Sequence, residues 1–118
     1  MRKTLLASMI ALALATLAAP ARAASAYAFP NPARQAPSVT FHAEVGQASG
    51  VRVSVYNVAG ELVHEGQVTG DPAVIEGAPA YEYKWDLANV ASGSYFLIVR
   101  ADVDGGNVIA KKSFTVIN

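Results

Sequence analysis

Apolar and polar residues alternate with a period of two along most of the chain after residue 37. In residues 38–45 (SVTFHAEV) and 51–56 (VRVSVY), every second residue is valine, phenylalanine or alanine. Successive side chains of a β-strand point to opposite faces, so this period predicts strands with one buried face. The same pattern predicts further strands at residues 61–68, 81–86, 94–102 and 107–117.

Turn-forming residues separate these strands. Asn57 and Gly60 follow the 51–56 strand, and because asparagine bonds its own backbone and glycine tolerates a positive φ, they predict a hairpin over residues 51–68. Residues 104–106 (DGG) predict a second hairpin turn. Residues 69–80 are rich in glycine and proline and predict the longest irregular connection, as needed for a crossing between two sheets.

The spacing of strands and turns predicts an all-β fold. Six to seven short strands in a domain of this size are typical of an immunoglobulin-like antiparallel β-sandwich, which we place at residues 37–118. Residues 24–36 form a short linker or entry strand before it. A small closed barrel is the alternative fold.

Residues 1–23 have a different pattern. A basic start is followed by an apolar run at 5–19 and then by small residues, which indicates a helical secretory signal peptide cleaved after Ala23, with Ala26 as the alternative site. The apolar run is shorter than the roughly 20 residues of a membrane-spanning helix. We therefore expect export to the periplasm, the cell surface or the medium, without a membrane span in the mature chain.

Composition narrows the classes of partner. The chain has nine basic and nine acidic residues. Three of the basic ones lie in the leader, so the mature chain has six against nine and a net charge of about −3. This charge argues against nucleic acid and anionic membranes, which attract cationic faces. There are no cysteines, so the core alone must stabilise the domain.

The residues predict no catalytic, metal or cofactor site. His42 and His64 are the only histidines, fewer than a zinc site needs, and we expect both to be solvent-facing strand residues. No Gly-x-Ser-x-Gly motif is present, so a small hydrolase is the weakest hypothesis. Asp102 and Asp104 faintly resemble a calcium loop, but Ser113 stands where such a loop needs glutamate, and a hairpin turn is the simpler interpretation.

Two surface features have alternative interpretations. Tyr81, Tyr83 and Trp85 alternate on one strand, which favours core packing over a platform for stacking sugar rings. Lys111 and Lys112 are either charges that protect an edge strand from unwanted pairing or part of a recognised tail.

Four segments occur in a characteristic order: Pro30-Asn31-Pro32 after an aromatic residue, then 51–63 (VRVSVYNVAGELV), 85–101 (WDLANVASGSYFLIVRA) and 110–117 (AKKSFTVI). In this order they resemble the C-terminal sorting domains of the type IX secretion system and the related immunoglobulin-like domain of the flagellar hook-capping protein. The resemblance extends from about Phe29 to Asn118. The family's motif positions fall on Pro30, Asn31, Pro32, Val55, Tyr56, Asn57, Gly60, Trp85, Gly93, Tyr95, Lys111 and Lys112.

This resemblance implies a non-enzymatic module that acts in protein sorting or cell-surface anchoring. Its partner would be an outer-membrane secretion translocon or the surface-attachment machinery, often with later cleavage and attachment to lipopolysaccharide. Family members normally follow a large cargo, whereas only a few residues separate the leader from Pro30 here. We therefore expect a free-standing module or the remnant of a longer protein. The alternative is a structural or adhesive module that binds protein or glycan.

Overall fold

A computed structural model describes residues 24–118, and all of its regular elements are β-strands. The predicted signal peptide lies outside the described residues. Cleavage after Ala23 would leave the first strand whole, whereas Ala26 lies inside that strand. The strands are β1 (Ser25–Phe29), β2 (Ala33–Arg34), β3 (Ser38–Glu44), β4 (Gly50–Tyr56), β5 (Leu62–Val68), β6 (Ala73–Ile75), β7 (Ala78–Asp86), β8 (Gly93–Val103) and β9 (Gly106–Ile117).

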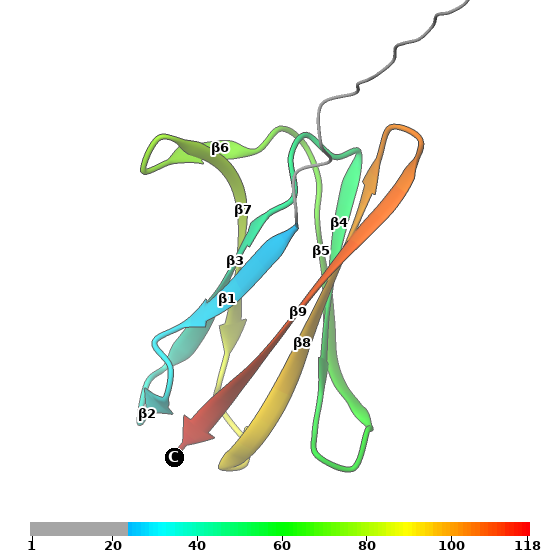
Figure 1. Cartoon of the computed structure of the whole chain (residues 1–118). Coiled ribbons are helices and arrows are strands. Elements are labelled where there is room, and N and C mark those ends of the chain that lie inside the picture. The colour runs from blue at the N-terminus through cyan, green and yellow to red at the C-terminus, as the bar shows by residue number, and fades with distance from the viewer. Residues whose placement is uncertain (1–23) are drawn as a thin grey trace, which may run out of the picture.

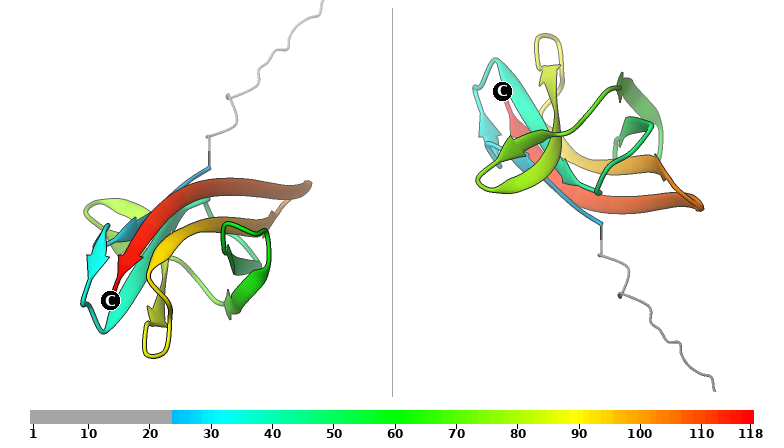
Figure 2. Two further views of the ribbon diagram at one scale, coloured as in Figure 1. Left: turned by 90° about the horizontal axis from the view of Figure 1, so that it is seen from below. Right: turned by 90° about the horizontal axis from the view of Figure 1, so that it is seen from above.

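The strands form two sheets packed face to face, which confirms the sandwich and excludes the closed barrel (Figures 1 and 2). One sheet has four strands in the order β1-β3-β7-β6, and the other has five in the order β2-β9-β8-β4-β5. Neighbouring strands are antiparallel, except that the two-residue β2 runs parallel to the end of β9. The chain changes sheet repeatedly, so each sheet is assembled from segments distant in sequence.

Three short strands add to the predicted six. β1 pairs with β3 along its whole length, from Ser25 opposite Glu44 to Phe29 opposite Thr40. β2 and β6 have two and three residues, too few for a period of two to be recognised. β1 lies within residues 24–36, which were expected to form a linker or an entry strand.

The prediction of an irregular connection at residues 69–80 was partly wrong. The segment does cross between the sheets, since it links β5 to β7. It also contains β6 and the first three residues of β7, which form a hairpin closed at Glu76 and Gly77, both with positive φ. Pro79 is tolerated in the β6–β7 ladder because the ladder has only three pairs and lies at the edge of the sheet. Gly77 therefore belongs to a tight turn and Pro79 to a short ladder at the edge of the sheet, and the segment is not an irregular loop.

Alternation in the sequence corresponds to burial in the core. The largest fully buried side chains are Phe41, Leu97, Val39, Val51, Val55, Val99 and Val116, drawn from both sheets. An aromatic cluster lies among them, in which the ring of Phe114 is 5.3 Å from Phe41 and 5.8 Å from Tyr95. Tyr81 and Trp85 are buried, as the core interpretation predicted, so neither presents a face for stacking on a sugar.

Within residues 24–118 there is no helix of the length and hydropathy needed to cross a membrane.

Candidate functional site

The Pro-Asn-Pro segment connects the two sheets at the start of the domain. It leaves β1 in the four-stranded sheet and enters β2 in the five-stranded sheet. The Asn31 side-chain oxygen accepts a hydrogen bond of 3.1 Å from the backbone N–H of Thr115 in β9. Pro30 and Pro32 both follow cis peptide bonds. The segment thus fastens the first strands of the domain to its last strand.

The Val-Tyr-Asn-x-x-Gly segment closes the hairpin between β4 and β5. The Asn57 side-chain oxygen accepts hydrogen bonds of 3.0 Å from the backbone N–H groups of Ala59 and Glu61. Gly60 adopts a φ of 81°, which favours glycine, and its N–H donates to the Asn57 carbonyl. Val55 is buried completely. Asparagine and glycine therefore have the turn role expected for them.

The Gly-x-Tyr segment begins β8 with a tyrosine anchored to the preceding loop. Gly93 is the first residue of the strand, and the Tyr95 hydroxyl donates a hydrogen bond of 2.7 Å to the carbonyl of Ala91. A tyrosine hydroxyl bonded to backbone a few residues upstream is a recurring device of immunoglobulin-like sandwiches. The Trp85 ring packs edge-on against Tyr95 at 5.9 Å. Trp85 and Tyr95 thus both pack in the core.

Tyr56, Lys111 and Lys112 differ from the other motif residues because they lie at the surface of the five-stranded sheet. Tyr56 is half-buried on the outer face, opposite Phe96 in the pairing of β4 with β8. Both lysines are exposed on β9, where β2 pairs only with Val116 and Ile117. Lys112 is opposite the buried Leu97 and therefore on the core side of the sheet, yet its side chain reaches solvent. An inward-pointing charge on an edge strand disfavours pairing with another chain, and that role for the lysines stays a prediction.

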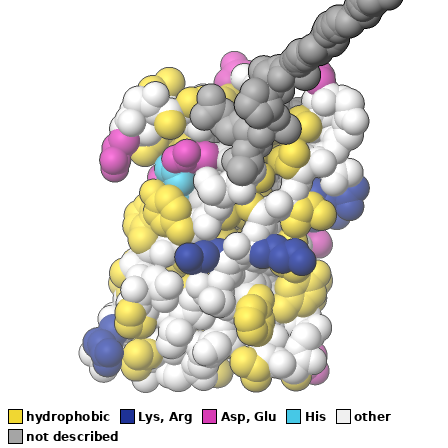
Figure 3. Space-filling model, in the orientation of Figure 1, with side chains coloured by type: hydrophobic (Ala, Val, Ile, Leu, Met, Phe, Trp, Pro, Cys, Tyr) yellow, Lys and Arg dark blue, Asp and Glu magenta, His cyan; other side chains and the backbone are white. Residues whose placement is uncertain are grey.

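The prediction of a solvent-facing His42 was wrong. Its side chain is 3% exposed and lies between two carboxylates, with Nδ1 2.8 Å from Glu82 and Nε2 3.0 Å from Glu44. The Tyr27 ring stacks on it at 4.7 Å. Figure 3 shows histidine and acidic side chains gathered beside apolar ones on the face that contains β1. β1 covers His42. The alternation within β3 could not predict this burial, because it depends on a different strand.

The two carboxylates also change the pKa of His42. Burial on its own lowers this pKa, but the hydrogen bonds to Glu82 and Glu44 and the charges of both carboxylates outweigh burial. The pKa of His42 is therefore raised above its ordinary value of 6.5. The cluster of His42, Glu44 and Glu82 is satisfied within the protein, which favours a structural role over a ligand site.

His64 is likewise not a solvent-facing residue. It is half-buried on β5 and faces β7, where its Nε2 lies 2.8 Å from the Tyr83 hydroxyl. Its ring stacks on Trp85 at 5.3 Å. A histidine thus joins the edge strand of one sheet to the other sheet, a contact between segments 19 residues apart.

Residues 102–107 form the predicted hairpin turn. Asp102 is opposite Asn107 and Val103 is opposite Gly106, which places Asp104 and Gly105 at the tip. In the part of the chain that the structure describes, no group of three His, Cys, Asp or Glu side chains is arranged to hold a metal ion, and in the His42 cluster both ring nitrogens are already bonded to Glu82 and Glu44.

The family model of the secretion system C-terminal sorting domain matches residues 27–113, which run from β1 into β9. The chain belongs to this family. Sorting domains of this kind are non-catalytic tags recognised by the type IX secretion machinery, and the chain accordingly functions in sorting for export to the cell surface or the medium. The resemblance to the immunoglobulin-like domain of the flagellar hook-capping protein stays a prediction. No curated protein matches the chain.

Proposed function

We propose that this sorting domain is read as a folded unit by an outer-membrane translocon, and that it has no catalytic activity of its own. The observation that supports this proposal is the extent of the family match, which covers both sheets. A linear tag would need only a few neighbouring residues, whereas these motif residues lie on segments that meet only after folding. Surface attachment of the exported protein would follow recognition.

The roles of the motif residues agree with recognition of shape. Asn31, Asn57 and Tyr95 each form hydrogen bonds that fasten loops to strands. Trp85 and Val55 are buried in the core. Since buried groups do not contact a partner, their part in sorting is to hold the domain in the conformation that a receptor binds.

A reporter fusion tests the proposal. Residues 24–118 are joined to the C-terminus of a periplasmic reporter and expressed in a host with type IX secretion. We expect the reporter at the cell surface or in the medium, measured by protease accessibility and by fractionation. The same fusion in a strain without the translocon is the control and should remain periplasmic. A reporter that stays periplasmic in both strains contradicts the proposal.

The second candidate function is adhesion, favoured by two exposed aromatic residues on the four-stranded sheet. Tyr27 and Phe29 are 44% and 41% exposed, with ring centres 5.9 Å apart. Aromatic faces of this kind bind apolar or sugar surfaces. A glycan array probed with the purified domain and with its Tyr27→Ser variant tests this function. Adhesion predicts that the wild-type domain binds a glycan and that the substitution abolishes this binding.

A further inference from the structure

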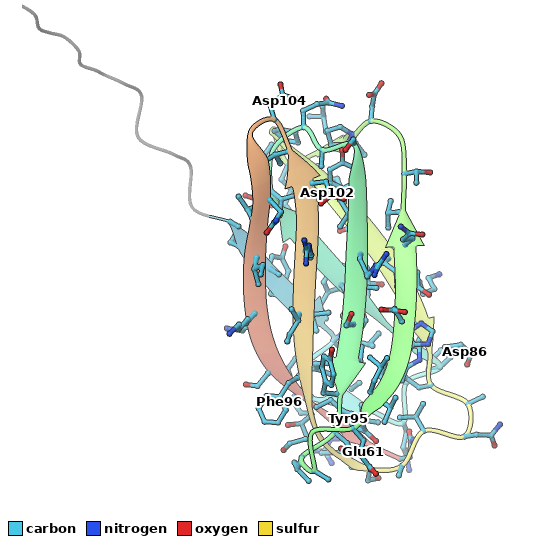
Figure 4. All side chains as sticks on the ribbon, turned by 90° about the vertical axis from the view of Figure 1, so that its right-hand side faces the viewer. Glu61, Asp86, Tyr95, Phe96, Asp102 and Asp104 are labelled. Carbon is cyan, nitrogen blue, oxygen red and sulfur yellow. The ribbon has the colours of Figure 1, made fainter. Side chains whose placement is uncertain are left out.

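Strand register sorts the outer face of the five-stranded sheet into rows that run across β5, β4, β8 and β9. Figure 4 looks onto this sheet, with Phe96 near its lower end and Asp102 and Asp104 at its upper end. Because cross-strand partners share a face, each row contains side chains that lie beside one another. The lowest row is Leu62, Tyr56, Phe96 and Ser113; the next is Glu65, Ser54, Ile98 and Lys111; the third is Gln67, Arg52, Arg100 and Ile109.

The lower rows form an exposed apolar surface. Leu62 and Phe96 are 50% and 45% exposed, although both are large apolar side chains. Ile98 is half-buried beside Phe96, and the two line an open cleft of about 480 Å³ together with Lys111 and Lys112. An apolar patch of this kind with polar neighbours marks an interaction site more often than random exposure. We name Leu62, Tyr56, Phe96, Ile98 and Lys111 the row surface.

Two positive charges next to the row surface lack an acidic partner within residues 24–118, whereas the acidic Glu61 beside Leu62 is hydrogen-bonded to Asn57. Arg52 lies 4.0 Å from Glu65, so these two charges balance each other. Arg100 and Lys111 form no ion pair with any residue in the described range 24–118. Asp102 is at the far end of the sheet from Phe96 (Figure 4). Cationic groups beside an apolar cleft complement a partner that presents apolar side chains bordered by carboxylates.

The motif residues point to the same face. Most of them are occupied in turns, in the core or in the Pro-Asn-Pro tie, as described above. Tyr56, Lys111 and Lys112 have no such role. Lys112 is on the core side of β9, opposite Leu97, whereas Tyr56 on β4 and Lys111 on β9 are on the outer face. Register brings Tyr56 and Lys111 to the row surface, on either side of β8.

We propose that the row surface is where this domain docks on its partner in the secretion machinery, and that the partner contributes an apolar segment flanked by acidic residues. This inference rests on the proposed function. A second copy of this chain is the competing occupant. The mature chain is acidic overall, but its own exposed aromatic pair, Tyr27 and Phe29, lies on the strand that covers His42, and that histidine already binds Glu44 and Glu82. A separate acidic partner therefore fits better.

Matched substitutions on the two outer faces test the inference in the reporter fusion. Phe96→Ser and Lys111→Glu alter the row surface. Val74→Ser and Lys84→Glu make comparable changes on the four-stranded sheet, where Val74 is 77% exposed against 45% for Phe96 and Lys84 is exposed as Lys111 is. Loss of a central contact typically costs enough binding energy to lower the exported fraction about fivefold to tenfold. We expect that loss for the row-surface variants and a change within about twofold for the controls.

Thermal unfolding and gel filtration of the variants complete the test. Thermal unfolding of the purified variants separates loss of docking from loss of folding, and Lys111→Glu alters an exposed side chain that need not perturb the core. Equal export of all four variants, or equal loss in both pairs, overturns the inference while leaving the sorting function intact. Failure of the wild-type fusion overturns both. If gel filtration shows a dimer that Phe96→Ser dissociates without affecting export, the face is a contact between copies and the inference is wrong.

Discussion

At the residue scale, single side chains decide how the two sheets meet at their open side. Gly66 on β5 lies directly against the ring of Tyr83 on β7, and an added Cβ at this glycine would overlap that ring. The Tyr83 hydroxyl is in turn hydrogen-bonded to His64. Tyr83 therefore has little freedom to move away, because its hydroxyl is bonded to His64, which lies on the same strand as Gly66.

We expect Gly66→Ala to destabilise the domain by roughly 1–3 kcal/mol, since overpacking forces side chains from their preferred positions. Urea unfolding measures the change. Gly50→Ala is the control, because a Cβ there has nothing within 4 Å and the effect should stay within about 0.5 kcal/mol. A Gly66→Ala protein as stable as the Gly50→Ala protein would show that Tyr83 relaxes freely.

His42 gives the domain a pH-dependent stability. Because its pKa is raised in the folded state, folding favours the protonated form. The stabilisation is fully present below the unfolded pKa of about 6.5 and is lost as pH rises through the higher folded pKa. The groups that face the ring are Glu44 on its own strand, Glu82 on β7 and Tyr27 on β1.

The expected result is a free energy of unfolding that falls over the pH range above about 6.5 in the wild type. In His42→Gln this slope should be shallower, and urea titrations across the range measure it. Parallel curves for the wild type and His42→Gln would rule out His42 as the source.

At the element scale, hydrogen bonds from side chains to backbone define where strands begin and turn. Asn57 organises the β4–β5 hairpin, Asn31 joins the first strands to β9, and Tyr95 ties β8 to the loop before it. The loops before β5 and β8, residues 57–61 (NVAGE) and 87–92 (LANVAS), contain several small residues with little side chain to pack. The polar anchors thus replace packing where little packing is available.

Tyr95→Phe removes the hydroxyl that bonds to the Ala91 carbonyl and keeps the ring in the core. We expect a loss of about 1 kcal/mol in the free energy of unfolding, the usual net value of one hydrogen bond. Tyr56→Phe is the matched control, because the Tyr56 hydroxyl has no protein hydrogen-bond partner in the described residues. Chemical denaturation of both variants measures the difference, and equal stabilities would contradict an anchoring role for Tyr95.

At the scale of the whole molecule, the four-stranded sheet depends on β1. Its other outer strand, β6, has only three residues, and Val74 in it is 77% exposed. β1 pairs along all of β3, buries Ala28 in the core and covers His42 with Tyr27. Without β1, two long strands would remain and β3 would become an exposed edge.

A protein that begins at Asn31 and lacks β1 should therefore lose more than about 3 kcal/mol of stability and tend to aggregate. Gel filtration and urea unfolding measure both effects. Val74→Ser, which alters the exposed β6, is the control and should behave as the wild type. A monomeric, stable protein without β1 would show that the sandwich is complete from β3 onward.

The alternation of apolar and polar residues was sufficient to predict six strands, the sandwich and most of its core. That prediction succeeded because burial on one face of a strand is a local property of the strand. β7 and β8 show it clearly, since Tyr81, Trp85, Leu97 and Val99 are buried at the alternate positions expected. The turn residues Asn57, Gly60 and Asp104 acted locally as well, and their places were predicted correctly.

What the sequence alone determined was thus the set of strands, their buried faces, the turns and, through the order of its motifs, the family. Tertiary structure decided the rest: the burial of His42 beneath β1, the contact of His64 with Tyr83, and the meeting of Tyr56, Phe96 and Lys111 on one face. These features depend on which strands become neighbours and in what register. Pairing joins segments far apart in the chain, and no period within a single segment contains that information.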